Sequence, residues 1–465
     1  MNLEGKRITD ELGQAYELER KLGEGGQGAV YSAKGGRQAI KILFNSSSNS
    51  RRELLRGQLQ NIRLMPELRD MAIARPLVML QAPYLGYVME LITGMVPISR
   101  LINPPRDLGH RGEWYLSGGG LRRRLLLLAR CAEVLAQLHG KGLVYSDPSP
   151  NNIFVSTDLD AHEIRLIDAD NLHYESSSST QGLYTPGYGA PELVLGKSGV
   201  NSLTDAHAFA VIAFKTLCLI HPLMGDLVEE GEPELEDKAL QGSLPWVDDL
   251  SDQSNATHHG FPRDIVLSPK LKELCRRCFS EGLREPVKRP GISQWVENLY
   301  SAADFTVECP DCGSTYYANQ QCCPWCDYPR PLLMELQIKR WEPLPDVREC
   351  QRFLSKQEVL PALALTERQP LILTNRIING RRGADHLETA IELQIERTNV
   401  RVRSLNGQCF WLSSFDGEQR TVVEVQDGWK RFPANDRRYT WLLHFAPTDR
   451  PHRLATFRFV SGEQS

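Results

Sequence analysis

Hydrophobic residues follow three successive patterns along this chain. A stretch at residues 16–22, in which apolar and charged residues are mixed, and an apolar run at residues 39–43 lie on either side of a glycine turn and predict β-strands in the N-terminal part. Further along, apolar residues recur at helical spacing, as in residues 204–217 and 292–302. After Pro331 the chain returns to short apolar stretches broken by turns. With 465 residues, the chain is expected to be an α+β protein of two or three domains.

Two apolar runs carry polar residues that are suited to chemistry. Residues 143–155 contain Asp147 and Asn152, and in residues 166–170 two apolar residues precede Asp168. If both runs are strands, these three side chains lie at one edge. This arrangement suits phosphoryl transfer, in which a carboxylate orients the attacking hydroxyl while an amide oxygen and a second carboxylate hold a divalent metal on the phosphates.

A glycine-rich turn and a lysine in an apolar strand lie upstream. Gly23, Gly25 and Gly28 follow the first predicted strand, and glycines let backbone N–H groups approach phosphate oxygens because no Cβ stands in the way. Lys41 comes 13 residues after Gly28, in a strand where an ammonium is costly without an anionic partner such as a phosphate or a carboxylate. An ordinary glycine-rich hairpin would leave this lysine unexplained.

These features occur in an order that resembles the eukaryotic-like (Hanks-type) protein kinase family over about residues 12–301. Residues 185–192, Thr-Pro-Gly-Tyr-Gly-Ala-Pro-Glu, resemble the end of a kinase activation segment. Asp205, in a predicted helix, matches the family's buried aspartate, and Arg289 matches the arginine that pairs with Glu192. The resemblance implies a bilobal fold that binds ATP and Mg²⁺ and phosphorylates serine or threonine.

The resemblance also implies a role for each candidate residue. Asp147 would be the catalytic base, and Lys41 would contact the ATP phosphates. Asn152 and Asp168 would hold Mg²⁺. The nucleotide-binding residues that the resemblance assigns are Gly23, Gly25, Gly28, Val30, Ala39, Lys41, Glu53, Met89, Glu90 and Leu91.

Two of these assignments concern particular contacts. Glu53, after a linker rich in serine and asparagine, is the best match to the glutamate of the family's helix C and is expected to pair with Lys41. Residues 86–94 resemble the strand and hinge behind the adenine pocket, with Met89 as the gatekeeper. Glu90 and Leu91 would then offer backbone groups to adenine.

The chain departs from the family in its catalytic loop and in its metal-binding motif. Tyr145-Ser146 replaces the usual His-Arg, which removes the cationic receptor for a phosphorylated activation loop. Ser149 replaces the usual lysine, which removes a charge that would neutralise the transferring phosphoryl group. RIO-like atypical kinases resemble this form and still transfer phosphate. Residues 168–170, Asp-Ala-Asp, replace Asp-Phe-Gly.

Two functions stay open for this sequence. One is an active kinase, and the other is a pseudokinase scaffold that binds nucleotide and serves protein assembly.

A polar run, Glu-Ser-Ser-Ser-Ser-Thr at residues 175–180, lies between the Asp-Ala-Asp motif and Thr185. It is either a solvated loop or an autophosphorylation tract, and the composition does not separate these two interpretations.

Four of the eleven cysteines form two Cys-x-x-Cys pairs. Cys309 and Cys312 form the first pair, and Cys323 and Cys326 form the second. Two such turns joined by a short hairpin complete a tetrahedral sulfur site, which resembles a zinc ribbon at residues 305–330. Since few apolar residues lie between the cysteines, metal is expected to supply most of the folding energy. Iron in a rubredoxin-like site is the alternative to Zn²⁺.

The other cysteines have different expected roles. Cys322 is a spare ligand next to Cys323, but the spacing favours Cys323. Cys275 and Cys278 share the Cys-x-x-Cys spacing, yet their helical surroundings predict core packing. Because no apolar signal core is seen near the first residues, a secreted disulfide framework is not expected.

Residues 331–465 combine short apolar stretches with turns such as Asn406-Gly407 and Asp416-Gly417, which predicts an antiparallel, β-sandwich-like domain. The predicted strands are residues 371–373, 390–395, 400–402, 409–412, 421–425, 439–445 and 456–460. Residues 380–407 resemble a forkhead-associated phosphothreonine-binding module, but the serine–histidine recognition pair of that family is missing.

Composition excludes several classes of protein. A net charge of −4 and a pI near 6.3 argue against a general nucleic-acid coat protein. No uninterrupted run of about 18 apolar residues occurs, so no membrane-spanning segment is expected. The composition therefore predicts a soluble cytoplasmic protein.

Three domains are predicted: a kinase domain at residues 1–301, a zinc ribbon at 305–330 and a β-rich domain at 331–465. Their order resembles the bacterial kinases that are encoded beside a von Willebrand A-domain protein and a metal-dependent protein phosphatase in tellurite-resistance-type clusters. The Tyr-Ser-Asp-Pro-Ser-Pro-Asn-Asn and Ile-Asp-Ala-Asp-Asn forms carry the same resemblance. It implies a protein substrate, with the A-domain protein and the phosphatase as partners.

Overall fold

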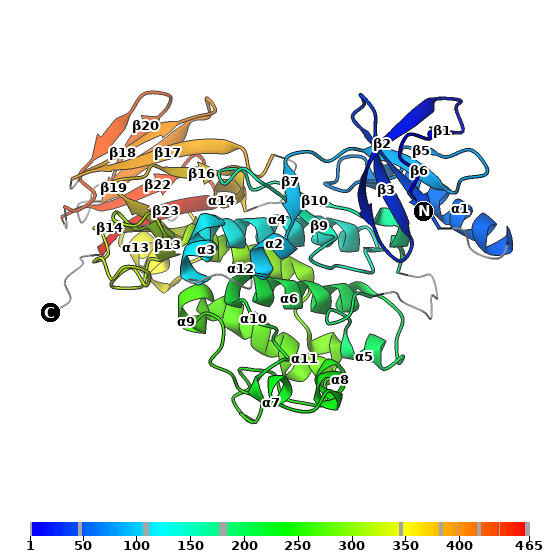
Figure 1. The fold of residues 1–465 in the computed structure, drawn as a ribbon. Helices are drawn as coiled ribbons and strands as arrows, with labels where there is room; N and C mark the ends of the chain where they lie inside the picture. Colours follow the sequence, from blue (N-terminus) through cyan, green and yellow to red (C-terminus); the bar gives the residue numbers. More distant parts are fainter. Residues whose placement is uncertain are drawn as a thin grey trace. The chain divides into compact units, whose positions relative to one another are not determined.

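The computed structural model describes residues 2–44, 49–105, 111–175, 184–343, 347–380, 385–397, 399–415, 420–436 and 438–460. The chain divides into two compact units (Figure 1), of which the first contains Met1–Gly119 and Arg123–Leu299. The second contains Gly120–Arg122 and Tyr300–Ser465. The predicted tract at residues 176–180 and the Asp416-Gly417 turn lie outside the described residues.

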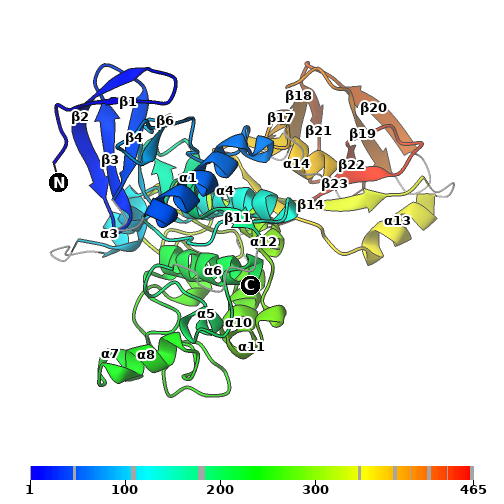
Figure 2. The same ribbon diagram turned by 90° about the vertical axis from the view of Figure 1, so that its right-hand side faces the viewer.

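The N-terminal part of the first unit is a six-stranded antiparallel sheet with the order β1-β2-β3-β4-β6-β5. Its strands are β1 (Arg7–Thr9), β2 (Ala15–Glu24), β3 (Gly28–Ala33), β4 (Gln38–Leu43), β5 (Val78–Met79) and β6 (Gly86–Glu90). Helix α1 (Asn49–Leu64) contacts β5 and lies beside the sheet (Figure 2), and the short helix η1 (Pro66–Leu68) follows it.

Glycine at position 28 is required by how closely β3 and β4 pack. A Cβ added to Gly28 would lie 2.4 Å from the carbonyl oxygen of Ile42, which leaves no room for a side chain. At Gly23 and Gly25 an added Cβ would meet nothing within 4 Å. Strand packing therefore explains Gly28, while the space beside the other two glycines is open to a ligand.

Residues before the kinase-like pattern also belong to the sheet. Leu3 and Ile8 pack in one hydrophobic cluster with Leu18 and Tyr31. Ile8 pairs with Tyr16 across β1 and β2. The folded sheet therefore starts earlier than residue 12, where the resemblance to kinases begins.

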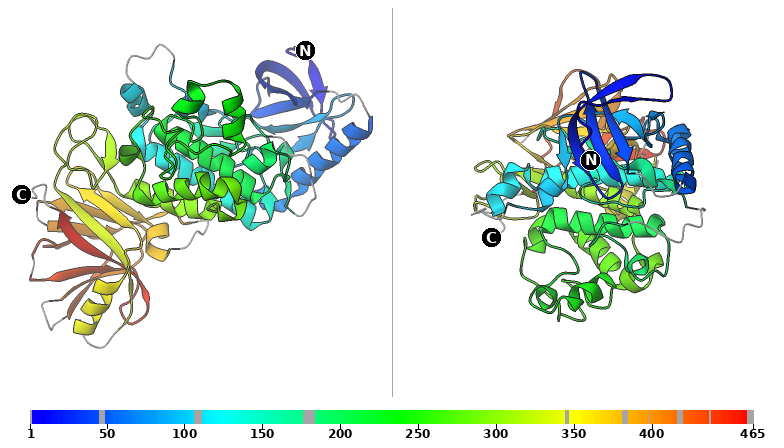
Figure 3. Two further views of the ribbon diagram at one scale, coloured as in Figure 1. Left: turned by 90° about the horizontal axis from the view of Figure 1, so that it is seen from below. Right: turned by 45° about the vertical axis from the view of Figure 1, so that its right-hand side comes forward.

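Helices dominate the chain between residues 99 and 304 (Figure 3). They are α2 (Ser99–Ile102), α3 (Arg111–Ser117), α4 (Gly120–Gly140), α5 (Pro191–Val194), α6 (Ser202–Cys218), α7 (Asp226–Glu229), α8 (Glu234–Leu240), α9 (Arg263–Val266), α10 (Pro269–Phe279), α11 (Glu281–Arg284), η3 (Pro286–Lys288) and α12 (Ile292–Asp304). Helix α6 is buried along most of its length, and the Asn201 side chain caps its start by accepting from the N–H groups of Leu203 and Thr204. Cys275 and Cys278 of α10 are both buried, as predicted.

Short strands of the first unit carry the loops that bear Asp147, Asn152 and Asp168. They are β7 (Met95–Pro97), β8 (Leu143–Val144), β9 (Ile153–Ser156), β10 (Ile164–Leu166) and β11 (His173–Tyr174), with η2 (Ala169–Asn171) between the last two. They form one sheet with the order β10-β9-β7 and one pair, β11-β8. Ile153 pairs with Leu166, so Asn152 and Ile167 lie at the same end of the β9–β10 hairpin. This is the common edge that the sequence predicts.

The second unit contains two larger antiparallel sheets. Their orders are β15-β14-β23-β22-β19-β20 and β16-β17-β18-β21. Their elements are β14 (Leu333–Trp341), β15 (Ala362–Thr366), β16 (Leu371–Thr374), β17 (Thr389–Glu396), β18 (Asn399–Ser404), β19 (Phe410–Phe415), β20 (Arg420–Val425), β21 (Lys430–Phe432), β22 (Thr440–His444) and β23 (His452–Val460), with helices α13 (Val347–Lys356) and α14 (Asn375–Asn379). Every strand that the sequence predicts after Pro331 overlaps one of these strands, and buried residues of both sheets form one hydrophobic cluster.

The four-cysteine segment follows β12 (Thr306–Glu308) and contains β13 (Thr315–Tyr317), and the two strands form a small antiparallel pair. Val307 and Tyr316 of this pair share a hydrophobic cluster with Leu333 of β14. Apolar packing therefore also supports the ribbon, and the share of its folding energy that a metal supplies stays a prediction. Sequence reasoning counted only apolar residues between the cysteines, whereas this packing partner comes after them.

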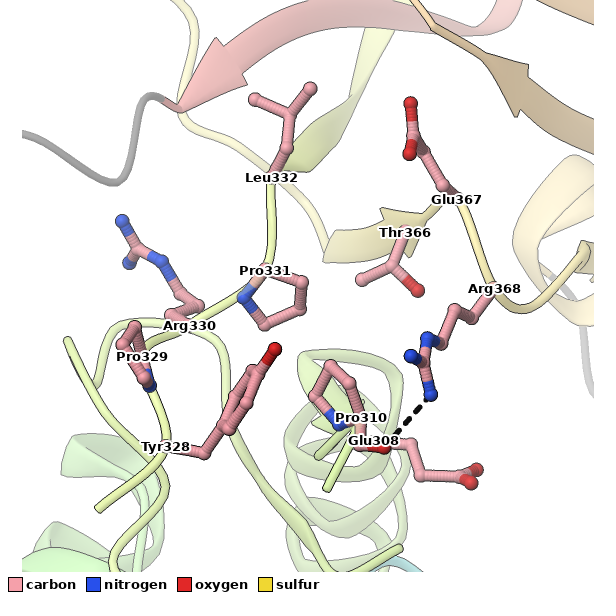
Figure 4. Close-up of a pocket in the computed structure, with 10 residues that line it drawn as sticks. All are labelled: Glu308, Pro310, Tyr328, Pro329, Arg330, Pro331, Leu332, Thr366, Glu367 and Arg368. Atoms are coloured by element: carbon pink, nitrogen blue, oxygen red, sulfur yellow. Dashed lines mark hydrogen bonds between the residues drawn. The ribbon is translucent and has the colours of Figure 1, made fainter.

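A pocket of about 480 Å³ lies where the ribbon meets the C-terminal strands (Figure 4). Tyr328, Arg330 and Arg368 are among the residues that line it. The Arg368 guanidinium donates to the carbonyl oxygen of Pro310 at 2.8 Å, and the Arg330 guanidinium donates to that of Ala318 at 2.8 Å. The first contact ties the ribbon to the segment that follows β15, and the second lies within the ribbon itself.

Among the helices that the structure describes, none is both long enough and apolar enough to cross a membrane.

Candidate active site

The four residues predicted to carry the chemistry meet in two contacting pairs. The Nζ of Lys41 lies 2.9 Å from Oδ1 of Asp168, although 127 residues separate them in the sequence. The Nδ2 of Asn152 donates to the backbone carbonyl of Asp147 at 3.2 Å and to its Oδ2 at 3.4 Å. The N–H of Ile167 donates to the Asn152 carbonyl at 2.9 Å, which joins the two pairs. The fold therefore brings all four predicted residues into one site.

Asp205 of α6 holds the loop that precedes Asp147. Its buried carboxylate accepts from the backbone N–H groups of Tyr145 at 2.8 Å and Ser146 at 3.0 Å, and it lies 3.0 Å from Nε2 of His139. These partners satisfy a carboxylate that burial would otherwise make costly. They also hold Ser146 at a φ of 80°, a backbone conformation that residues other than glycine rarely adopt.

Tyr145 and Ser146, which the resemblance places where the family usually has His-Arg, connect their loop to the segment around Asp168. The Tyr145 hydroxyl donates to the carbonyl of Ile167, and the Ser146 hydroxyl donates to that of Asn171 at 2.8 Å. Burial raises the pKa of Tyr145 well above its ordinary value, so its hydroxyl stays protonated and remains a donor. Neutral hydrogen bonds make this connection, in place of an arginine.

The carboxylate of Asp147 is held by Thr185, a partner that sequence reasoning missed. The Thr185 N–H donates to Oδ1 at 2.8 Å, and its hydroxyl donates to Oδ2 at 3.0 Å. Burial raises the pKa of Asp147, and the two bonds from Thr185 offset part of that rise. The signal in the sequence was the position of Thr185 at the start of the Thr-Pro-Gly-Tyr-Gly-Ala-Pro-Glu motif.

Arg289 and Glu192 form the ion pair that the sequence predicts. Both guanidinium nitrogens that contact Glu192 lie 2.6 Å from its carboxylate oxygens. Arg289 is 3% exposed, so the pair is well shielded from water. A two-point contact of this kind fixes the end of the activation segment against η3.

A comparison with protein families matches the protein kinase domain to residues 16–301. The chain belongs to the protein kinase family. Among relatives, a DNA damage-responsive serine/threonine-protein kinase of Deinococcus radiodurans is 30% identical over 229 residues, which cover 46% of this chain and 31% of the relative. The serine/threonine-protein kinase pkn2 of Myxococcus xanthus is 27% identical over 224 residues, which cover 46% of this chain and 25% of the relative.

A rat calcium/calmodulin-dependent protein kinase type 1B is 23% identical over 316 residues, which cover 65% of this chain and 80% of the relative. The chain thus spans only a quarter to a third of the length of the two bacterial relatives named above. The predicted membership of the kinase family is confirmed, and the bacterial relatives carry the names of serine/threonine kinases.

The helix carboxylate expected to pair with the kinase lysine does not do so. Glu53 is exposed on α1, and the residues that α1 buries are Leu59 and Ile62. The carboxylates within ion-pair distance of Lys41 among the described residues are Asp168, at 2.9 Å, and Asp170, at 2.6 Å. The orientation of α1 causes the difference, because its packed face is apolar.

The residues predicted to surround adenine come together in one apolar cluster. Ala39 and Met89 pair directly across β4 and β6, and Val30 and Leu91 pack against the same cluster. The Leu91 N–H donates to the carbonyl of Arg37 at 2.8 Å, so this predicted contact for adenine already has a partner. These apolar side chains suit contact with an adenine ring, and one of the two backbone contacts predicted for adenine is already in use.

The residues of the kinase site fit ATP and Mg²⁺. The Asp168 side chain is 38% exposed, so a cation can reach its carboxylate. The amide nitrogen of Asn152 faces Asp147, which leaves the amide oxygen to bind a cation. Mg²⁺ prefers carboxylate and amide oxygens of this kind. The open backbone at Gly23 and Gly25, together with the Lys41 ammonium, suits phosphate.

The four predicted metal ligands also come together. The Sγ atoms of Cys309, Cys312, Cys323 and Cys326 all lie within 4.8 Å of one another. The Cys309–Cys326 and Cys312–Cys323 sulfur distances are 3.5 and 3.7 Å. A tetrahedral Zn²⁺ with bonds of about 2.3 Å places its sulfurs roughly 3.8 Å apart, so the cluster could hold zinc. Cys322 is exposed and outside the cluster.

Proposed function

We propose that this protein is an ATP-dependent serine/threonine protein kinase that phosphorylates a partner protein. The observation that carries the proposal is the site in which Lys41 contacts Asp168 while Asn152 contacts Asp147. Thr185 supports it, because two hydrogen bonds hold the Asp147 carboxylate in one orientation. The names of the bacterial relatives support serine or threonine as the acceptor.

In the proposed reaction the oxygen of a serine or threonine hydroxyl bonds to the γ-phosphorus of ATP. The bond from that phosphorus to the β–γ bridging oxygen breaks, which leaves ADP. Asp147 orients the hydroxyl and accepts its proton, and Lys41 binds the phosphates. Asn152 and Asp168 would hold Mg²⁺, which supplies positive charge to the phosphates when bound.

A nucleotide-binding pseudokinase scaffold is the alternative. Ser149 is 2% exposed and carries no charge, so the catalytic loop supplies no cation where related kinases have a lysine. This position favours the scaffold, whereas the intact set of Lys41, Asp147, Asn152 and Asp168 favours the enzyme.

The deciding experiment follows radiolabel from the γ-phosphate of ATP into protein, for the purified wild type beside Asp147→Ala. The proposal expects transfer by the wild type and a loss of at least about 100-fold in the variant. ATP binding is measured for both proteins. Wild-type protein that binds ATP without transferring phosphate to itself, to basic protein or to a partner would establish the scaffold instead.

We also propose that the four cysteines bind one Zn²⁺ in a ribbon at residues 305–330, and that residues 331–465 form a β-sandwich. Thiolates are the ligands that structural zinc prefers, which supports zinc over iron. The two antiparallel sheets that share one hydrophobic cluster support the sandwich.

The proposed partners rest on the resemblance to bacterial kinase clusters. A co-encoded von Willebrand A-domain protein would be the substrate or a scaffold for it, and a metal-dependent phosphatase would reverse the reaction in the same cytoplasmic compartment. Incubating the purified kinase with the A-domain protein and radiolabelled ATP, followed by the phosphatase, tests both roles. No label on the A-domain protein would remove it as the substrate.

A further inference from the structure

Lys41 has two carboxylate partners, and they differ in access to solvent. Asp168 lies 2.9 Å from the ammonium and its side chain is 38% exposed, whereas Asp170 lies 2.6 Å away and its side chain is 7% exposed. A metal ion can reach the first carboxylate much more easily than the second. If Asp168 turns to Mg²⁺, as the proposed function requires, Asp170 is the anion that stays with the lysine.

Tyr87 holds the buried carboxylate of Asp170. Tyr87 lies directly opposite Lys41 in the pairing of β6 with β4, so both side chains project from the same face of the sheet. Its hydroxyl donates to Oδ1 of Asp170, and the oxygen that contacts Lys41 is Oδ2. Each oxygen of the carboxylate therefore has its own partner.

The contact between Lys41, Asp170 and Tyr87 is shielded from water. Lys41 is 3% exposed and Tyr87 is fully buried. Asp168 and Asp170 both contact the buried ammonium of Lys41, and these two contacts offset the cost of burying its charge. A buried ammonium without a carboxylate would be strongly unfavourable.

Helix α1 does not supply an alternative carboxylate. Its one acidic residue is Glu53, which is exposed, and Leu55 and Leu59 are the side chains that it adds to the cluster around Met89. The helix also contacts η2, the turn that contains Asp170. The helix therefore supports the turn by packing and not by charge.

We propose that Asp170 is the positioning residue for Lys41, in the role that a helix glutamate has in related kinases, with Tyr87 fixing its orientation. The inference rests on the proposed kinase function. One short segment, residues 168–170, then carries both the metal-binding carboxylate and the partner of the lysine. A displacement of α1 would then act on the ion pair through its packing against the η2 turn, and not by withdrawing a carboxylate of its own.

The test is a double-mutant cycle on Mg·ATP affinity, measured by titration of the full-length protein with wild type, Asp170→Asn, Lys41→Ala and the double variant. Without Asp170, Lys41 and the metal compete for Asp168, so Asp170→Asn is expected to weaken affinity by about tenfold. In the Lys41→Ala background the same change should have no further effect. An equal loss in both backgrounds would mean that Asp170 binds metal directly, and would overturn the proposal. Unchanged or tighter binding by Asp170→Asn would overturn it as well.

Matched variants separate positioning from folding. Asp170→Glu keeps the charge and is expected to lie closer to wild type than Asp170→Asn, and Tyr87→Phe should lose less than Asp170→Asn. Asp160→Asn makes the same chemical change at an exposed turn and should bind as wild type does. Glu53→Gln should lose less affinity than Asp170→Asn, and the opposite order would return the role to the helix. Thermal unfolding without ATP checks that each variant is folded.

Phosphate transfer is measured on the same proteins. Asp170→Asn is expected to lower kcat along with affinity, because misplaced phosphates also slow the chemical step. If wild-type protein transfers no phosphate, the proposed function fails, but the binding cycle still decides the role of Asp170.

Discussion

The four-cysteine cluster and the active site both gather polar side chains, but over very different lengths of chain. Cys309 and Cys326 are 17 residues apart, whereas Lys41 and Asp168 are 127 residues apart. A short hairpin brings the thiols together by local geometry, and a metal would add the binding energy. The charges of the active site meet only because the core of the first unit holds their strands and loops in place. The comparison predicts that losing one cysteine damages local structure, while losing one active-site charge stops chemistry in a folded protein.

The largest expected effect comes from variants that disable the active site while the protein stays folded. Asp168→Asn and Lys41→Ala should each reduce phosphate transfer by at least about 100-fold, because each removes charge placed on metal or phosphate. Radiolabel transfer measures the loss, and circular dichroism with thermal unfolding checks the fold. Asp168→Asn is the cleaner variant, since Lys41→Ala also leaves the buried Asp170 without its cation.

The matched control for Asp168→Asn is again Asp160→Asn, at an exposed position. Its rate should equal that of the wild type. If Asp168→Asn kept more than a tenth of wild-type turnover, the assignment of this carboxylate to the metal would be wrong.

The second-largest effect is expected from a variant that disrupts the cysteine cluster while the active site stays intact. The wild type should contain one zinc per chain, and Cys323→Ser should lose most of it, because three thiolates no longer complete the tetrahedral shell. The ribbon should become disordered and lose its contact with Leu333. The affinity for ATP should stay unchanged. Elemental analysis, limited proteolysis and ATP titration give the three readouts.

Two variants at residues near the cysteine cluster serve as controls for this result. Cys322→Ser removes an exposed thiol outside the cluster, and Arg368→Ala removes the hydrogen bond to Pro310, so both should keep the metal. Iron in the wild type, full metal content in Cys323→Ser, or loss of ATP binding along with the metal would each contradict a stated part of the assignment.

The smallest expected effect concerns Thr185, which holds Asp147, the proposed catalytic base. Thr185→Val removes the hydroxyl bond to Oδ2 of Asp147 and keeps the backbone bond to Oδ1. The expected cost is about tenfold in kcat, since hydrogen bonds to charged groups contribute roughly 1.5 kcal/mol or more. The KM for ATP should change little, because Thr185 contacts the base and not the predicted nucleotide-binding residues.

Thr185→Ser retains a hydroxyl and should recover most of the rate. If the valine and serine variants lose activity equally, the methyl group and not the hydrogen bond supports the base.

The sequence by itself determined the features whose residues lie close together in the chain. Asp147 and Asn152 share one loop, and Asp168 follows a strand that pairs with the strand after that loop, so their common edge could be predicted from the hydrophobic pattern. The four cysteines could be predicted as a cluster for the same local reason. The strands after Pro331 followed from their spacing and turn residues.

Where no family motif assigned the partner, only the tertiary structure decided which residues meet over long distances. Glu53 and Asp170 are both carboxylates that could reach a lysine, and the sequence favoured Glu53 through its resemblance to helix C. The choice depends on which face of α1 packs inward, and that face is apolar because Leu59 and Ile62 gain more from burial than a carboxylate would. The sequence also did not reveal that Leu333 packs against the ribbon, because Leu333 lies outside the four-cysteine segment. The free energy of burying a side chain depends on every element packed around it, so the sequence pattern of one element does not determine the partner.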